Sequence, residues 1–127
     1  MKSADLKLEY WAIKRPKPHP KNARSHPPEQ VRQLVASIKE FGFTKPIVCD
    51  EKNEILAGHG AYQAALQLGL EKVPVVVRTG LSQAQKRAYR IADNKLGEKS
   101  VWEDSLLAGE FAALKDAGYD LSLTGWG

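Results

Sequence analysis

Three short polar clusters carry most of the chemistry that this sequence could perform. They are Asn22-Ala23-Arg24, Gly58-His59-Gly60 and Asp93-Asn94-Lys95. A nucleoside triphosphate bound with a divalent ion requires free N–H groups at a helix N-terminus, cations that balance the phosphate charge, and oxygen ligands for the metal. The clusters contain candidates for all three parts. We therefore expect a phosphate site if the fold brings the clusters together.

The glycine cluster lies between an apolar run and a helical pattern. Ile55-Leu56-Ala57 predicts a short strand, and the segment from Ala61 to Leu68 is rich in alanine and leucine and ends at Gly69. A strand, a tight turn and a helix N-terminus then follow in order, which is a geometry that attracts anions. The turn lacks the spacing of a dinucleotide fingerprint and the Lys-Ser/Thr ending of a P-loop, so a purely structural turn stays open as an alternative.

Positive charge is concentrated in the first half of the chain. Residues 1–63 contain 11 Lys or Arg against 7 Asp or Glu, whereas residues 64–127 contain 8 of each. The excess is densest in a basic, proline-rich loop, 14–28, which its prolines hold extended. Such a loop can contact the phosphates of DNA, and the alternative is a solvated basic loop. The candidate DNA-binding residues are Lys14, Arg15, Lys17 and Lys21.

Alternating helices and strands are expected to position these clusters. The patterns predict an α/β or α+β fold, with a short mixed sheet and about four helices in a single domain spanning residues 1–127. Strands are predicted at 6–13, 46–50, 53–57 and 73–78, and helices at 27–41, 61–68, 83–96 and 103–115. The strands at 46–50 and 53–57 flank a polar turn and predict a hairpin. The C-terminal helix and tail, 103–127, end without a breaker, which suggests truncation from a longer protein.

Composition excludes several classes of protein. The chain is 43% hydrophobic and 27% charged, as in soluble globular proteins, and it has neither a long apolar segment nor a signal peptide. We therefore expect a cytoplasmic protein without a membrane partner. The single cysteine, Cys49, lies in an apolar run and is expected to be a buried hydrophobe, not a catalytic thiol. His19, His26 and His59 lack the spacing of a metal cage.

The order of several sequence blocks resembles that of the ParB/sulfiredoxin superfamily. More narrowly, the chain resembles the ParB-like domain, also called the ParB-like nuclease domain, found at the N-terminus of bacterial and phage DNA amino-methyltransferases. The resemblance covers roughly residues 6–126. It rests on Asn22-Ala23-Arg24, the segment 34–48, Ala57-Gly58-His59-Gly60, the segment 64–69, Arg90-Ile91-Ala92-Asp93-Asn94-Lys95-Leu96 and Asp120-Leu121-Ser122-Leu123-Thr124-Gly125.

The resemblance implies a nucleotide, CTP or ATP with magnesium, bound between the glycine turn and the helix that carries Asp93 and Asn94. Asn94 would reach the metal, and Asp93 would replace the family's glutamate as catalytic base or metal partner. NTP hydrolysis and a homodimer are further implications. The implied nucleotide-binding residues are Arg24, Thr44, Lys45, Gly58, His59, Gly60, Ala61 and Asn94.

Two departures from the family pattern bear on activity. Ala61 stands where the family has an arginine that meets the phosphates, so the site is expected to be impaired. An introduced substitution and natural divergence to a scaffold both stay open. Sulfiredoxin chemistry needs a cysteine in the glycine turn, whereas Cys49 lies well before it, so reductase activity is not expected.

Two other functions remain alternatives at this point. One is a DNA-binding or nuclease domain in its own right, without nucleotide turnover; a fused or associated DNA methyltransferase domain belongs to the nucleotide-binding hypothesis. The other is a non-catalytic interaction domain in which Trp11, Trp102 and Trp126 help to form a partner surface.

Overall fold

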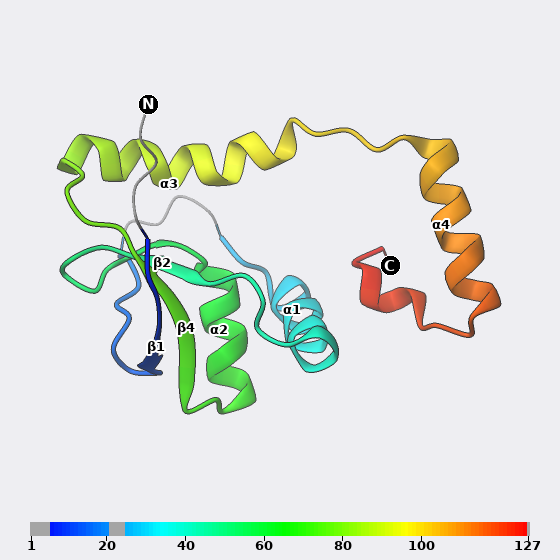
Figure 1. Cartoon of the computed structure of the whole chain (residues 1–127), viewed down its shortest axis with the longest axis horizontal. Helices are drawn as coiled ribbons and strands as arrows, with labels where there is room; N and C mark the ends of the chain where they lie inside the picture. The colour runs from blue at the N-terminus through cyan, green and yellow to red at the C-terminus, as the bar shows by residue number, and fades with distance from the viewer. Residues whose placement is uncertain (1–5, 21–24, 127) are drawn as a thin grey trace.

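The computed structural model describes residues 6–20 and 25–126 and contains one mixed sheet with helices around it (Figure 1). This architecture confirms the predicted fold class. The strands are β1 (Leu8–Ala12), β2 (Ile47–Cys49), β3 (Ile55–Ala57) and β4 (Lys72–Val77). The helices are α1 (Pro28–Phe41), α2 (His59–Leu68), α3 (Gln83–Glu98), α4 (Asp104–Asp116) and the short 3₁₀ helix η1 (Leu121–Thr124).

The sheet has the strand order β1-β4-β2-β3. β4 pairs antiparallel with β1 and parallel with β2, and β2 pairs antiparallel with β3. The predicted hairpin is therefore confirmed, and its turn includes Asn53 in the left-handed region with φ 68°. The hairpin brings β3, and the glycine turn that follows it, to one edge of the sheet.

The core lies between the sheet and α2. Trp11 of β1, Ile55 of β3 and Tyr62 of α2 are buried together with Cys49 at the end of β2. The Tyr62 hydroxyl donates a hydrogen bond to the Ile13 carbonyl oxygen at 2.8 Å, so its polar end is satisfied. Burial raises the pKa of Cys49 to about 12, which keeps the thiol protonated. The expectation that Cys49 is buried is confirmed.

α1 begins beside Pro27 and ends before Gly42, and it packs against α2. Among its apolar residues only Val31 is fully buried, and Phe41, the last residue of the helix, is 54% exposed.

α3 begins with a capping box, in which the Ser82 side chain and the Gln85 side chain each bond to the other residue's backbone N–H. The helix lies along the sheet next to β3 (Figure 1). It continues through Gly97 to Glu98, past the predicted end at residue 96. A glycine inside a helix costs only about 1 kcal/mol, so Gly97 alone does not stop it.

α4 and η1 lie beyond α1, away from the sheet (Figure 1). Trp126 makes edge-to-face contacts with Trp102, at 5.5 Å between ring centroids, and with Phe111, at 5.9 Å. The apolar residues Leu107, Phe111 and Leu114 of α4 are half-buried. Trp11 is buried and cannot belong to a partner surface, whereas Trp102 is exposed. Within residues 6–20 and 25–126, no helix has the length and apolar character needed to cross a membrane.

Candidate functional site

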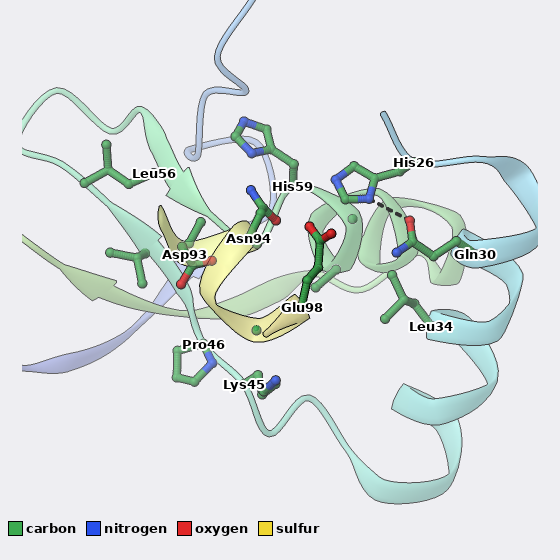
Figure 2. A pocket seen from close by; sticks show the side chains of 16 residues that line it. His26, Gln30, Leu34, Lys45, Pro46, Leu56, His59, Asp93, Asn94 and Glu98 are labelled. Carbon is green, nitrogen blue, oxygen red and sulfur yellow. Dashed lines mark hydrogen bonds between the residues drawn. The ribbon is translucent and has the colours of Figure 1, made fainter. Parts of the chain in front are cut away.

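A cavity of about 540 Å³ lies where β3, the start of α2 and the end of α3 meet (Figure 2). Its wall includes the glycine cluster, Gly58-His59-Gly60, and the first two residues of the acidic cluster, Asp93 and Asn94. The fold therefore brings together two of the three polar clusters. The third cluster, residues 22–24, lies outside the described residues. The predicted site residues Arg24 and Lys21 are therefore both outside the part of the chain that the structure describes.

The shape of the glycine turn depends on the absence of two side chains. Gly58, at the N-terminal boundary of α2, has φ 101°, and a Cβ there would lie 3.2 Å from the Ile47 Cα. A Cβ on Gly60 would lie 2.8 Å from His26 Nδ1 and 3.1 Å from Leu34 Cδ1. α2 begins at His59, two residues before the predicted start, so its first-turn N–H groups belong to the glycine cluster itself.

The imidazole ring of His59 is buried and has a structural hydrogen bond. Its Nε2 accepts a hydrogen bond from the backbone N–H of His19 at 3.1 Å. Burial is the main cause that lowers the pKa of His59 to about 4, and electrostatic interactions with His26, Arg90 and His19 contribute to this shift. The ring is therefore neutral at pH 7 and supplies no charge to a phosphate. It ties the proline-rich loop to the start of α2.

On the opposite wall, α3 places oxygen-bearing side chains toward the cavity. Figure 2 shows Asn94 and Glu98 projecting into the space between α3 and His26, with Asp93 nearer to Leu56. Asn94 Nδ2 donates to the Arg90 carbonyl oxygen at 2.9 Å, which fixes the orientation of the amide. Glu98 was not predicted as a site residue. Its position four residues after Asn94 would have revealed it had the predicted helix been extended through Gly97.

The remaining predicted residues divide by position. Lys45 and Ala61 line the cavity, and Lys45 is exposed at its edge. Thr44 is exposed and is not among the lining residues within the described part of the chain. His26 lines the cavity as well, with Nδ1 2.8 Å from Gln30 Oε1, a contact drawn in Figure 2.

The donor set of the cavity meets part of what magnesium requires. Asp93, Asn94 and Glu98 offer carboxylate and amide oxygens, which are the hard ligands that Mg²⁺ prefers. Among the described residues, no group of three or more His, Cys, Asp and Glu side chains could hold a metal by itself. The residues fit an ion that takes one or two protein ligands and completes its shell with phosphate oxygens and water.

A second polar cluster lies behind the cavity, where α3 crosses the β2–β3 turn. Lys86 Nζ lies 2.9 Å from Asp50 Oδ2 and 3.0 Å from Glu51 Oε1, and Arg90 Nη2 lies 3.4 Å from Glu54 Oε2. The hydrogen bonds from Lys86 to Asp50 and to Glu51 raise the pKa of the lysine. Nothing in the sequence pattern pointed to these pairs, because their members lie in two distant segments.

The candidate DNA-binding residues that the structure describes lie along the loop after β1. The Arg15 guanidinium stacks 3.8 Å above the Trp11 ring centroid, so it contributes to packing. The Lys17 backbone is held by the hairpin: its N–H donates to the Asn53 carbonyl oxygen at 2.7 Å, and its carbonyl oxygen accepts from the Ile55 N–H at 2.9 Å. The side chains of Lys14 and Lys17 are exposed.

Sequence comparison finds relatives with similar domains. The ParB-like nuclease domain-containing protein YnaK of Escherichia coli is 49% identical over 85 residues, which cover 67% of this chain and 98% of that protein. A nucleoid occlusion protein of Bacillus cereus is 33% identical over 69 residues, and a probable chromosome-partitioning protein ParB of Treponema pallidum is 32% identical over 75. The chain spans only 23% of the length of each of these two proteins.

Solved structures share the fold. C-terminally truncated ParB of Caulobacter crescentus, complexed with CTP-γ-S, superposes with a TM-score of 0.77 at 21% identity, covering 93% of this chain and 68% of that one. Sulfiredoxin of Arabidopsis thaliana has a TM-score of 0.55 at 22% identity, covering 65% of this chain and 96% of that one. The sequence model of the ParB N-terminal domain matches residues 6–95, a segment that contains β1 to β4 and both described clusters of the cavity. This chain belongs to the ParB N-terminal domain family.

Proposed function

We propose that this ParB-like domain binds a nucleoside triphosphate, CTP or ATP, with magnesium in the cavity between the glycine turn and α3. The observation that carries the proposal is that the glycine turn and α3 line one cavity. Its wall contains Gly58-His59-Gly60 at the start of α2 and Asp93 and Asn94 of α3. A helix N-terminus next to oxygen ligands suits a phosphate chain and its metal ion.

The size and lining of the cavity support a nucleotide. Its volume of about 540 Å³ lies within the range of small-molecule sites. Leu34, Pro46 and Leu56 give part of the wall an apolar character suited to a base or ribose, whereas the polar groups gather at the glycine turn and on α3. The Caulobacter crescentus ParB with the similar fold was solved with CTP-γ-S.

Each group of the cavity has a proposed role. The N–H groups of His59, Gly60 and Ala61 donate to phosphate oxygens, and Lys45 neutralises phosphate charge. Arg24 and Thr44 are proposed to join them. Asn94 would hold the magnesium ion, which when bound would draw charge from the phosphates. Asp93 would either join Asn94 as a metal ligand or act as the base that accepts a proton from the attacking water during hydrolysis.

Ala61 is expected to weaken this site. An arginine at the third residue of α2 would begin on the cavity wall and could form two charge-assisted hydrogen bonds to a phosphate. Loss of such a partner lowers affinity by about 2 kcal/mol, or roughly thirtyfold. Ala61→Arg is therefore expected to increase the affinity for nucleotide, which tests the site by a gain of binding.

Isothermal titration calorimetry with CTP, ATP and GTP, each with and without magnesium, tests the proposal on the unmodified chain and on Ala61→Arg. We expect magnesium-dependent binding of CTP or ATP, at least tenfold tighter in Ala61→Arg. If neither protein binds any nucleotide at millimolar concentration, the proposal is wrong. Release of inorganic phosphate from the bound nucleotide then tests turnover separately, with Asp93→Asn as the inactive control.

Contact with DNA through the basic loop is a second proposed function. It is favoured by the exposed side chains of Lys14 and Lys17 on a backbone anchored by the hairpin, and Arg15 and Lys21 are proposed to contribute. A rigid backbone lets such lysines contact phosphates with little loss of conformational entropy. A fused or associated DNA methyltransferase domain and a second copy of the chain are the proposed protein partners.

A further inference from the structure

One face of α3 connects the β2–β3 turn to the cavity. Lys86, Arg90 and Asn94 are spaced four residues apart and therefore lie in one row along the helix. Lys86 and Arg90 contact the acidic turn, and Asn94 lies in the cavity wall. The same row thus carries ion pairs at one end and a proposed metal ligand at the other.

Backbone hydrogen bonds in the β2–β3 turn hold the Asp50 carboxylate in position for Lys86. Asp50 Oδ1 accepts the backbone N–H groups of Lys52, at 2.8 Å, and of Glu54, at 2.9 Å, so the turn is fixed around this carboxylate. Its other oxygen, Oδ2, lies 2.9 Å from Lys86 Nζ. The side chains of Lys86 and Asp50 are 2% and 1% exposed.

Apolar packing holds α3 only in part, through the half-buried residues Tyr89 and Ala92. Lys86 is the one fully buried residue that the helix has. Ile91 and Leu96, in its second half, are 59% and 63% exposed. A buried ion pair is seldom the most stabilising way to fill a space, but it accepts only one geometry. The rotation of α3 about its axis is therefore set mainly by its ion pairs.

Arg90, the second cation of the row, is also largely buried. Its side chain is 12% exposed, and its Nε is buried with no hydrogen-bond partner within the described residues. Nη2 nevertheless reaches Glu54, and the Arg90 carbonyl oxygen accepts the hydrogen bond from Asn94 Nδ2. Arg90 thus contacts the turn through its side chain and the cavity residue through its backbone.

We propose that Lys86 and Arg90, paired with Asp50, Glu51 and Glu54, form a clamp that positions α3 so that Asp93 and Asn94 line the cavity. Each residue of a helix turns by about 100°, so a rotation of even one residue would move both side chains out of the cavity. The clamp residues are positioning residues and do not contact the ligand. This inference rests on the proposed nucleotide site.

Glu54→Gln is the test variant. Glu54 is 38% exposed, lies outside the cavity wall and loses only its charge, so the protein is expected to fold. We expect the Kd for the magnesium nucleotide, measured in the Ala61→Arg background, to rise about tenfold. Arg87→Gln, on the exposed face of the same helix, is the matched control and should change Kd less than twofold.

A double-mutant cycle separates positioning from a merely structural effect. If the clamp acts through Asn94, Glu54→Gln should change Kd less than threefold in the Asn94→Ala background. A Kd unaffected by Glu54→Gln, or an equal fold-change in both backgrounds, would overturn the clamp.

Amide hydrogen exchange supplies a readout that needs no ligand. Exchange of residues 91–98 should accelerate in Glu54→Gln and stay unchanged in Arg87→Gln. Equal exchange in both variants overturns the clamp. Absence of nucleotide binding by the unmodified chain and by Ala61→Arg, with faster exchange in Glu54→Gln, instead overturns the nucleotide site and keeps the clamp.

Discussion

Lys86 on α3 and Asp50 in the β2–β3 turn form an ion pair, 2.9 Å long, from which water is nearly excluded. Lysine and aspartate are seldom buried to this extent unless they are paired. The pair joins the end of one strand to the helix that carries the proposed metal ligands. Stability and site geometry therefore depend on the same contact.

Removal of the Asp50 carboxylate should destabilise the whole domain. Asp50→Ala removes the carboxylate that accepts the backbone N–H groups of Lys52 and Glu54 and pairs with Lys86. We expect the free energy of unfolding to fall by about 3 kcal/mol at pH 7. Urea unfolding followed by circular dichroism measures this loss. Glu29→Ala, which removes an exposed ion pair with Arg32, is the control and should change stability by less than about 1 kcal/mol.

The same pair predicts a pH dependence. Burial raises the pKa of Asp50, but the hydrogen bonds from Lys86 and from the backbone of Glu54 and Lys52 outweigh it, so the pKa lies below its usual value. A lowered pKa means that the contribution of Asp50 is present above about pH 4 and is lost as the pH falls further. The stability difference between the unmodified chain and Asp50→Ala should therefore shrink below pH 4.

His59 should make stability depend on pH in a higher range. Its pKa is about 4 in the folded protein and about 6.5 in the unfolded chain, so the unfolded chain takes up the proton first as the pH falls. The full shift corresponds to about 3 kcal/mol, and solvent screening reduces the expected loss to about 1 to 2 kcal/mol between pH 6.5 and 4.

His59→Gln removes this titration and retains a side-chain acceptor for the His19 N–H. Urea unfolding at several pH values should give a flatter curve for the variant from pH 6.5 to 4. Parallel curves would show that the pKa of His59 is not lowered in the folded protein.

Gly60→Ala should weaken nucleotide binding in the cavity more than it lowers the stability of the fold. The new Cβ would lie 2.8 Å from His26 Nδ1 and 3.1 Å from Leu34 Cδ1, so these two cavity-lining side chains must shift. We expect about tenfold weaker nucleotide binding, measured by calorimetry in the Ala61→Arg background.

Gly109→Ala is the matched control for this change, because Gly109 is also helical and no atom lies within 4 Å of the position that its new methyl group would take. It should raise stability by up to about 1 kcal/mol and leave binding unchanged. Equal affinity of Gly60→Ala and the unmodified site would mean that the first turn of α2 does not contact the ligand.

The sequence predicted the sheet and most helices because their boundaries have local causes. The alternation around Trp11, the polar turn after Cys49 and the cap at Ser82 each involve neighbours in the chain. The end of α3 was placed wrongly because a helix can pass through a glycine, and Glu98 was missed as a result.

Prediction of the site from the sequence was more limited. The glycine turn and Asp93-Asn94 were predicted as site residues because residues of these types suit phosphate and metal, and they line one cavity, but their binding roles stay predictions. The Lys86 pairs with Asp50 and Glu51 could not be found, since charged residues in helices are usually solvated. The structural role of the His59 ring was equally hidden, because its partner is a backbone group of the proline-rich loop.

The basic loop gives a prediction that does not involve the nucleotide. If Lys14 and Lys17 contact DNA phosphates, replacing both with glutamine should reduce the slope of log K against log salt by about 2. Arg15 is left in place because its guanidinium packs on Trp11 and its removal would disturb β1. Fluorescence anisotropy with a duplex at several salt concentrations measures the slope. Lys39 and Lys115, exposed on α1 and α4, form the control pair, and an equal loss from both pairs would show that the loop is not the DNA contact.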